Sequence, residues 1–264
     1  MHFEIIRSAR AESIPLLVHV PHSSTNIPNV IRRTLCLTDD ELRREVLCMT
    51  DWYTDRLFEG VLGLGGTLFV NRLSRLVVDP ERFPDDGQEI MAARGMGAVY
   101  MKTADGRPLR TELASVERST LLDTYFHPYA QALADVVSQL LSQHGRCVIL
   151  DGHSFPSKPL PYELNQETLR PQICLGTDEW HTPESLVREM EVRCFAQGLH
   201  VARNTPFAGT YVPQRYWHTD SRVSSIMIEI QRDLYMDEQT GAETAGLKRI
   251  QELITGMVGW MAQW

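Results

Sequence analysis

Seven short apolar segments, alternating with amphipathic helical patterns, constrain the fold of this chain more than any other feature. Several of them are apolar without a break, which is typical of strands covered on both faces of a sheet. Strands that alternate with helices favour an α/β fold around a mixed, largely parallel sheet. The segments comprise residues 16–20, 67–70, 76–78, 146–150, 172–175, 199–202 and 225–230.

Four helices are expected between and after these strands. The first begins at Thr38, which stands at capping-box spacing from Glu41, and continues toward Leu47. A longer one follows Thr111, where apolar residues recur every three or four positions as far as Leu141. A proline suited to the first turn predicts a helix over residues 182–197, and an apolar face predicts the last over residues 240–261.

Composition narrows the class of protein. The chain has 264 residues, 43% of them apolar, enough for a sizeable core in a single domain over residues 1–264. A formal net charge of -8 and the lack of a basic run argue against nucleic acid or an anionic membrane as a partner. The sequence has no signal-peptide pattern and no apolar stretch of membrane-spanning length, so we expect a cytoplasmic protein. The sequence is also compatible with a homo-oligomer. Five cysteines without a CxxC pair argue against disulfides or thiolate zinc ligands.

Polar residues follow two of the apolar segments, where strands should end. His22 follows residues 16–20, and His153 follows residues 146–150. The carboxyl edge of an open sheet is where α/β folds bind ligands, so two histidines on neighbouring strands can converge on one metal ion. Asp151 would then orient a histidine, and Ser154 would lie close behind. The alternative is that these residues only cap their own loops.

Two aspartates compete for the third ligand position. Asp51 and Asp55 are four residues apart, so on a helix that begins near Thr50 they lie on one face. One would complete a metal shell, and the other would hold a histidine or an arginine. We favour Asp51 as the ligand, because the start of the helix is nearest to the strand ends. The alternative is that Asp51 caps the helix and Asp55 pairs with Arg56 or Arg75 on the surface.

Glu229 is a carboxylate within the apolar segment 225–230. Burying such a group is costly unless it is paired or functional, and general bases are tuned by partial burial. The alternative is that Glu229 faces solvent near an edge of the sheet. Two imidazoles, a carboxylate and an unpaired acid are what a hydrolytic zinc site requires, so we expect one Zn²⁺ per chain.

Arginines form a further cluster around Asp79. Arg72, Arg75 and Arg82 lie close together in the sequence, and planar bidentate donors suit an anionic substrate or a developing oxyanion. The alternative is a salt-bridge network. Long turn-rich stretches at residues 79–106 and 155–169 are expected to wall the active site.

Six segments, taken in order over nearly the whole chain, resemble the successive motifs of the N-formylglutamate amidohydrolase family. This family is similar to zinc carboxypeptidases and aspartoacylase, which implies a three-layer α/β/α architecture with zinc at the strand ends. The resemblance implies His22, Asp51 and His153 as metal ligands and Glu229 as the catalytic glutamate. The segments read LLVHVPHSSTNIP, TDWYTDRLF, RLVVDPERFPDD, ILDGHSFPS, PFAGTYVPQRYW and IMIEIQRDLYMDE.

The same resemblance implies roles in substrate binding. Arg75 would polarise the scissile carbonyl. Arg82 would hold a substrate carboxylate. In the mechanism that we expect, Arg215 or Tyr211 would support Arg82, with Asp79 beside them.

The sequence departs from the family pattern in two places. Where many relatives have a second histidine in a YHxPYHxxL-like helix, this chain reads Tyr125-Phe126-His127-Pro128-Tyr129-Ala130. The usual DLNR motif reads Asp79-Pro80-Glu81-Arg82, so a negative charge replaces a neutral amide at Glu81.

The expected activity is zinc-dependent hydrolysis of an N-acyl amino acid, such as N-formylglutamate. One alternative is a non-catalytic protein of this fold that binds an anionic N-acyl ligand. A serine hydrolase based on Ser154 is the other, although no G-x-S-x-G elbow surrounds that residue.

Overall fold

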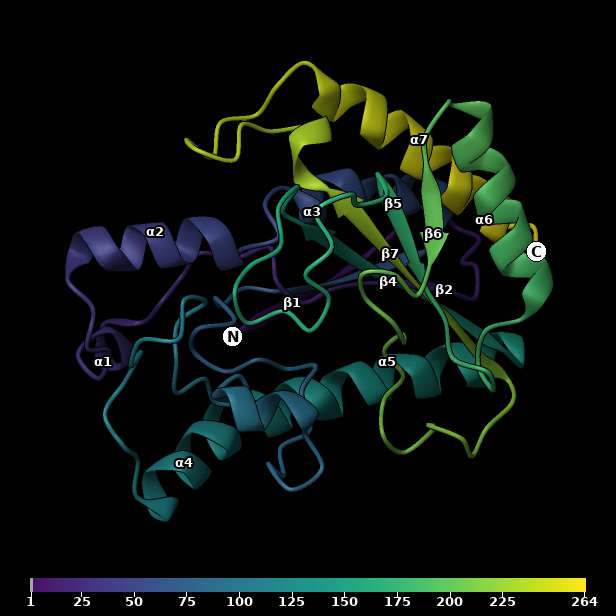
Figure 1. Cartoon of the computed structure of the whole chain (residues 1–264). Helices are drawn as coiled ribbons and strands as arrows, with labels where there is room; N and C mark the ends of the chain where they lie inside the picture. Colours follow the sequence, from purple (N-terminus) through teal and green to yellow (C-terminus); the bar gives the residue numbers. More distant parts are fainter. Residues whose placement is uncertain (1) are drawn as a thin grey trace.

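A computed structural model describes residues 2–264, which form a mixed sheet of seven strands in the order β1-β3-β2-β4-β7-β5-β6 (Figure 1). The central strands β3, β2, β4 and β7 run parallel, as do β5 and β6, whereas β1 is antiparallel to β3 and β5 to β7. The strands are β1 (Phe3–Arg7), β2 (Leu16–Val20), β3 (Thr67–Asn71), β4 (Cys147–Phe155), β5 (Ile173–Gly176), β6 (Val201–Arg203) and β7 (Val223–Gln231).

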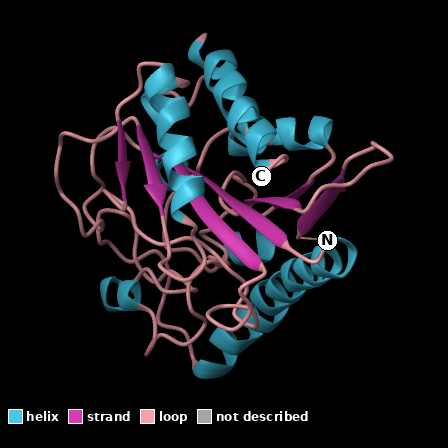
Figure 2. Ribbon diagram, turned by 90° about the vertical axis from the view of Figure 1, so that its right-hand side faces the viewer, coloured by secondary structure: helices cyan, strands magenta, loops and turns pink. Residues whose placement is uncertain are grey.

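Helices cover both faces of the sheet and give it three layers (Figures 1 and 2). One face packs against α5, and the other packs against α3, α6 and α7. The expected three-layer α/β/α fold with a largely parallel sheet is therefore confirmed. The helices are α1 (Asn29–Arg32), α2 (Asp39–Met49), α3 (Thr54–Leu57), α4 (Ser115–Leu121), α5 (His127–His144), α6 (Glu184–Ala196) and α7 (Gly246–Met261).

Strand alternation sorts the core residues between the two layers. In β2, Leu16, Val18 and Val20 pack in the core under α6 and α7, whereas Leu17 packs in the core under α5. Because successive side chains point to opposite faces, His19 shares the α5 face with Leu17. Both faces are buried, which explains why the central strands read as continuous apolar runs.

One strand prediction was wrong, and one strand was not predicted. Residues 76–78 form a turn, not a strand, although Leu76, Val77 and Val78 are buried there in small satellite cores. The sequence analysis also missed β1, a short and partly exposed edge strand. Burial of an apolar run does not by itself require a sheet, and an edge strand lacks the continuous apolar signal.

The helix predictions were largely correct in position. The Thr38–Glu41 capping box is present at the start of α2. The long helix expected after Thr111 is present from residue 115, but it is interrupted by a π-helical segment over Leu122–Phe126 before α5. The last helix begins at Gly246, later than expected. Within residues 2–264, the helices are too short or too polar to span a membrane.

Candidate metal centre and active site

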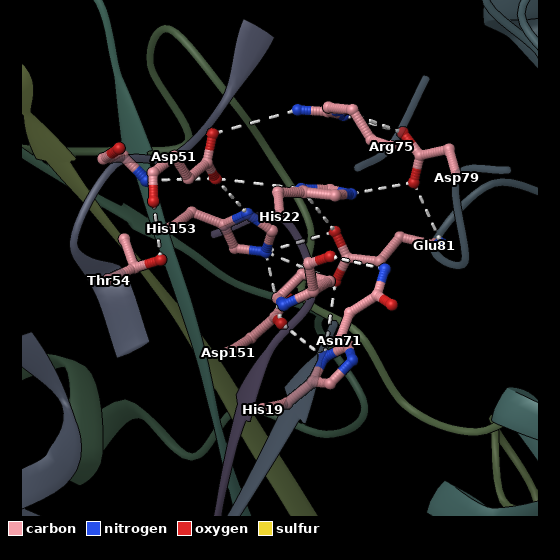
Figure 3. Close-up of polar contacts among 12 residues, drawn as sticks. His19, His22, Asp51, Thr54, Asn71, Arg75, Asp79, Glu81, Asp151 and His153 are labelled. Atoms are coloured by element: carbon pink, nitrogen blue, oxygen red, sulfur yellow. Dashed lines mark hydrogen bonds and ion pairs between the residues drawn. The ribbon is translucent and has the colours of Figure 1, made fainter. Parts of the chain in front are cut away.

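Three residues from separate parts of the chain face one another at the carboxyl end of the sheet (Figure 3). His22 lies two residues beyond β2, Asp51 lies between α2 and α3, and His153 belongs to β4. One donor atom of each lies within 4.8 Å of the others, and all three side chains are buried. The backbone amide of Asp51 donates to the carbonyl oxygen of His22 at 3.0 Å, which fixes these two segments together. The structure thus brings together the three ligand candidates named from the sequence.

His22 is oriented from behind by Asp79. Its Nε2 lies 2.8 Å from Asp79 Oδ1, so this nitrogen carries a proton and donates it. Its Nδ1 is buried and, within residues 2–264, has no hydrogen-bond partner. Asp51 Oδ2 lies 3.7 Å from this nitrogen, too far for a hydrogen bond. A free ring nitrogen with a carboxylate behind the ring is the usual arrangement of a metal-binding histidine.

A second carboxylate holds His153. Its Nε2 lies 3.2 Å from Asp151 Oδ1, and its Nδ1 faces Asp51 Oδ2 at 3.1 Å. Asp151 is itself fixed by the backbone amide of Tyr211 at 3.0 Å and by Nδ1 of His19 at 2.9 Å. His19 was missed from the sequence. The sequence feature that could have identified His19 is the same one that identified Glu229: a polar side chain inside an otherwise apolar strand.

Arg232, which was also missed, holds Asp51. Its guanidinium is buried immediately after β7 and donates to Asp51 Oδ1 at 2.9 Å and to the Ser154 hydroxyl at 3.1 Å. The backbone amide of Ser154 donates to Asp51 Oδ2 at 3.3 Å. Burial raises the pKa of Asp51, but the hydrogen bond with His153 and the charges of Arg232 and His22 bring it well below its ordinary value. Asp51 is therefore ionised, with Oδ2 facing both histidines.

The electrostatic environment of the two histidines favours a positive charge. Burial and Arg75 lower the pKa of His22, yet the charge of Asp79 and nearby hydrogen bonds raise it above its ordinary value. Burial also lowers the pKa of His153, whereas neighbouring carboxylates, first among them Glu81, raise it well above its ordinary value. A cation between the rings would supply this positive charge. Two imidazoles and a carboxylate are donors that zinc prefers, so these residues fit a zinc ion.

Glu229 lies on β7, in register with His153 on β4. Its side chain lines the cavity, is 8% exposed, and has an Oε2 atom without a hydrogen-bond partner within residues 2–264. Burial raises the pKa of Glu229 to about 8, although the charge of His153 opposes this shift. A carboxyl group that gains and loses a proton near neutral pH is suited to acid–base catalysis.

The arginines differ in how fully they are paired. Arg75 donates to Asp79 Oδ2 from Nε at 3.2 Å and from Nη2 at 2.8 Å, and its Nη1 lies 3.9 Å from Asp51 Oδ1. Arg82 is less buried, and its ion-pair contacts with Asp79 and Glu89 are 3.8 and 3.6 Å long. Because both contacts exceed hydrogen-bond length, Arg82 retains donors for a ligand.

Asp79 was expected beside the substrate, but the structure places it behind the site. It is fully buried, and its oxygens accept hydrogen bonds from His22, from Arg75 and from the Tyr100 hydroxyl. Burial raises the pKa of Asp79, but the charges of His22 and Arg75 hold it well below its ordinary value. Asp79 therefore positions two functional side chains and has no oxygen left for a substrate.

Glu81 adds a negative charge beside both candidate ligands. Its Oε2 lies 3.2 Å from His153 Nε2 and 3.6 Å from His22 Nδ1, and its Oε1 lies 3.5 Å from His19 Nδ1. The side chain is 15% exposed. The departure from the family motif therefore lies at the centre of the site and not at its edge.

A cavity of about 920 Å³ opens over this cluster. Parts of the two predicted wall loops line it, together with a third segment around residues 206–217 that includes Tyr211 and Arg215. The Tyr211 ring lies 4.8 Å from the ring of His19, whereas Arg215 is exposed at the edge of the cavity.

Asp55 lies away from the cluster. The prediction that Asp51 and Asp55 share a helix was wrong, because Tyr53 has a positive φ of 62° and α3 begins only at Thr54. Asp55 instead accepts a hydrogen bond from Arg72 at 3.2 Å and does not line the cavity. It cannot replace Asp51 without rearrangement of this segment.

Comparisons with known proteins agree with this architecture. An N-formylglutamate amidohydrolase from Ralstonia eutropha JMP134 superimposes with a TM-score of 0.84, at 24% identity, over 99% of this chain and 97% of the other. A protein from Agrobacterium tumefaciens superimposes with a TM-score of 0.69, at 20% identity, over 97% of this chain and 95% of the other. At these identities the two structures support the fold.

Sequence relatives point to one enzymatic class. An N-formylglutamate deformylase of Pseudomonas aeruginosa is 27% identical over 97% of both chains, and one of Pseudomonas putida is 26% identical over 85% of this chain and 83% of its own. The family model described as N-formylglutamate amidohydrolase matches residues 14–236. The chain therefore belongs to the N-formylglutamate amidohydrolase family and is a hydrolase that acts on an amide.

Proposed function

We propose that this chain is a zinc-dependent amidohydrolase that cleaves the amide bond of an N-formyl amino acid and releases the free amino acid and formate. One observation supports the metal dependence: His22, Asp51 and His153 turn donor atoms toward one another, and Nδ1 of His22 is buried and has no partner among the described residues 2–264. The names of the Pseudomonas relatives support the N-formyl substrate class.

His22, through Nδ1, and Asp51, through Oδ2, would hold one zinc ion together with His153. When bound, zinc would polarise the scissile carbonyl and lower the pKa of a water molecule. Asp79 and Asp151 fix the orientation of the two imidazoles, and Arg232 binds Asp51 Oδ1, so that Oδ2 is the oxygen that faces the two histidines.

Glu229 is the proposed general base. Its unpartnered Oε2 is available to take a proton from the attacking water, and its raised pKa lets it return that proton to the leaving amine. Its position in β7, beside His153 of β4, keeps the carboxyl group close to the candidate ligands.

Two arginines would position the substrate. Nη1 of Arg75 faces the cluster, so it is placed to donate to the oxygen of the scissile carbonyl as negative charge develops there. Arg82 retains donors for the α-carboxylate of the amino acid, and Arg215 lies at the cavity edge in support. These contacts would orient the amide relative to Glu229.

Glu229→Gln tests the proposal directly. The variant should retain about one zinc per chain, measured by elemental analysis, and lose hydrolysis of N-formyl amino acids by about 10²–10⁴-fold. Glu179→Gln, an exposed position, serves as the matched control and should retain both properties. Full turnover by metal-loaded Glu229→Gln would rule out Glu229 as the base.

A further inference from the structure

The outer part of the cavity has an apolar rim, formed by Phe83, Ile90, Leu164 and Trp217. Three of these side chains are exposed to solvent, Ile90 by 77%, Leu164 by 65% and Trp217 by 41%. The Phe83 and Trp217 rings lie 6.0 Å apart. Large exposed apolar side chains that line a site are typical of ligand-binding surfaces, because their exposure costs free energy until a ligand covers them.

The cavity is also large for a formylated acidic amino acid. Its volume of about 920 Å³ is near the upper end of the range for pockets that enclose drug-sized ligands. A small dianion held at the candidate metal centre would leave the apolar rim uncovered. The substrate that fills this space must extend outward from the amide and present apolar surface to the rim.

The charges of the lining disfavour a second carboxylate on the substrate. Seven acidic side chains and four arginines line the cavity, and one of the acids, Glu163, is already paired with the buried Arg170 outside the lining, which leaves six acids against four arginines. A divalent cation would offset two of these charges, which leaves no excess of positive charge. Arg82 can take the α-carboxylate, whereas Arg215 is more than half exposed at the cavity edge, 3.9 Å from Asp135, where solvent weakens its attraction for a second carboxylate. Glu81 and Glu89, both in the lining, would repel a further anion.

We propose that the preferred substrate is an N-formyl derivative of an amino acid with a large apolar side chain, aromatic or branched aliphatic, which packs on the apolar rim. This inference rests on the proposed amidohydrolase function. The formyl group would lie at the metal centre, the α-carboxylate at Arg82, and the side chain against Trp217 and its neighbours. Burial of a large apolar side chain should favour these substrates by about ten- to a hundredfold in kcat/KM.

The test compares N-formyl-L-phenylalanine and N-formyl-L-leucine with N-formyl-L-glutamate on zinc-loaded protein, by measuring the amine released. The expected kcat/KM is at least about tenfold higher for the two apolar substrates. Trp217→Ala should reduce the ratio of kcat/KM for N-formyl-L-phenylalanine to that for N-formyl-L-glutamate. Trp180 is an exposed tryptophan outside the cavity, and Trp180→Ala should leave this ratio unchanged. Ile90→Lys, at a position that is 77% exposed, should lower the ratio of kcat/KM for N-formyl-L-phenylalanine to that for N-formyl-L-glutamate.

Two outcomes separate this inference from the function on which it rests. If the protein prefers N-formylglutamate and neither rim variant changes the ratio of kcat/KM values, the inference of an apolar substrate is wrong. The proposed amidohydrolase function would then still stand. Calorimetric titration of zinc-loaded Glu229→Gln gives the binding preference without turnover. If Glu229→Gln binds the apolar derivatives more tightly but the native chain hydrolyses none of them, the result would support the role of the apolar rim in binding. It would overturn the proposed amidohydrolase function.

Discussion

Replacement of Arg232 by methionine tests how the structure holds Asp51, the third candidate metal ligand. The guanidinium is 4% exposed and donates to Asp51 Oδ1 at 2.9 Å, to the Ser154 carbonyl at 3.0 Å and to the Cys48 carbonyl at 2.6 Å. Methionine fills a similar volume but donates to none of these oxygens. The buried carboxylate of Asp51 therefore loses its cationic partner, and two carbonyl groups lose a donor.

The expected cost is large for a single substitution. Removing one partner of a buried ion pair costs about 3–5 kcal/mol, because the remaining charge stays in a poorly solvated site. We therefore expect the free energy of unfolding of metal-free Arg232→Met to fall by about this amount. Zinc affinity should fall about 10–100-fold, since Asp51 loses the contact that orients it.

Urea denaturation in the presence of a chelator measures the first effect, and competition with a chromophoric chelator measures the second. Arg203→Met is the matched control, because that arginine is paired with Glu184 and Glu191 on the surface. Exposed pairs contribute about 0–1 kcal/mol each, so the control should change little. A loss below about 1 kcal/mol in Arg232→Met, with unchanged zinc affinity, would refute this account of Asp51.

Two further predictions concern a buried acid and the choice between two aspartates. Burial raises the pKa of Glu45 to about 7, so the carboxyl group destabilises the folded protein by about 3 kcal/mol once ionised. Unfolding free energy should therefore decline as pH rises from about 4.5 to 7, and Glu45→Gln should make this decline smaller by about 3 kcal/mol in urea titrations, while the contribution of Glu229 remains; an unchanged decline would contradict the assignment. Asp51→Asn should strip zinc from the protein, whereas Asp55→Asn should leave the metal content unchanged; the reverse pattern would make Asp55 the ligand.

Polar residues within and just after apolar segments were the most informative feature of the sequence. His22 and His153 were recognised because each follows an apolar segment, and Glu229 because a polar side chain among buried strand residues requires a reason. The same logic applied to His19, which was overlooked since it lies in the middle of β2 and not at its end. The register of β2 and β4 places His19 opposite Asp151, and that pairing cannot be read from either strand alone.

Contacts between distant segments were not predictable from the sequence. Arg232 reaches Asp51 only because β7 and the segment after α2 meet at the same end of the sheet. The turn at Tyr53, with its positive φ, separates Asp51 from α3 and breaks the helical spacing on which the pairing with Asp55 relied. Residues 76–78 were misread because burial in a satellite core produces the same apolar run as a strand.

The location of bound zinc tests the central claim most directly. Crystals of the zinc-loaded protein, measured above and below the zinc absorption edge, should show one anomalous peak per chain, in contact with His22, Asp51 and His153. Zinc coordination distances are about 2.0–2.2 Å for nitrogen and carboxylate oxygen ligands. A peak that avoids these three side chains, or its absence at saturating zinc, would contradict the account.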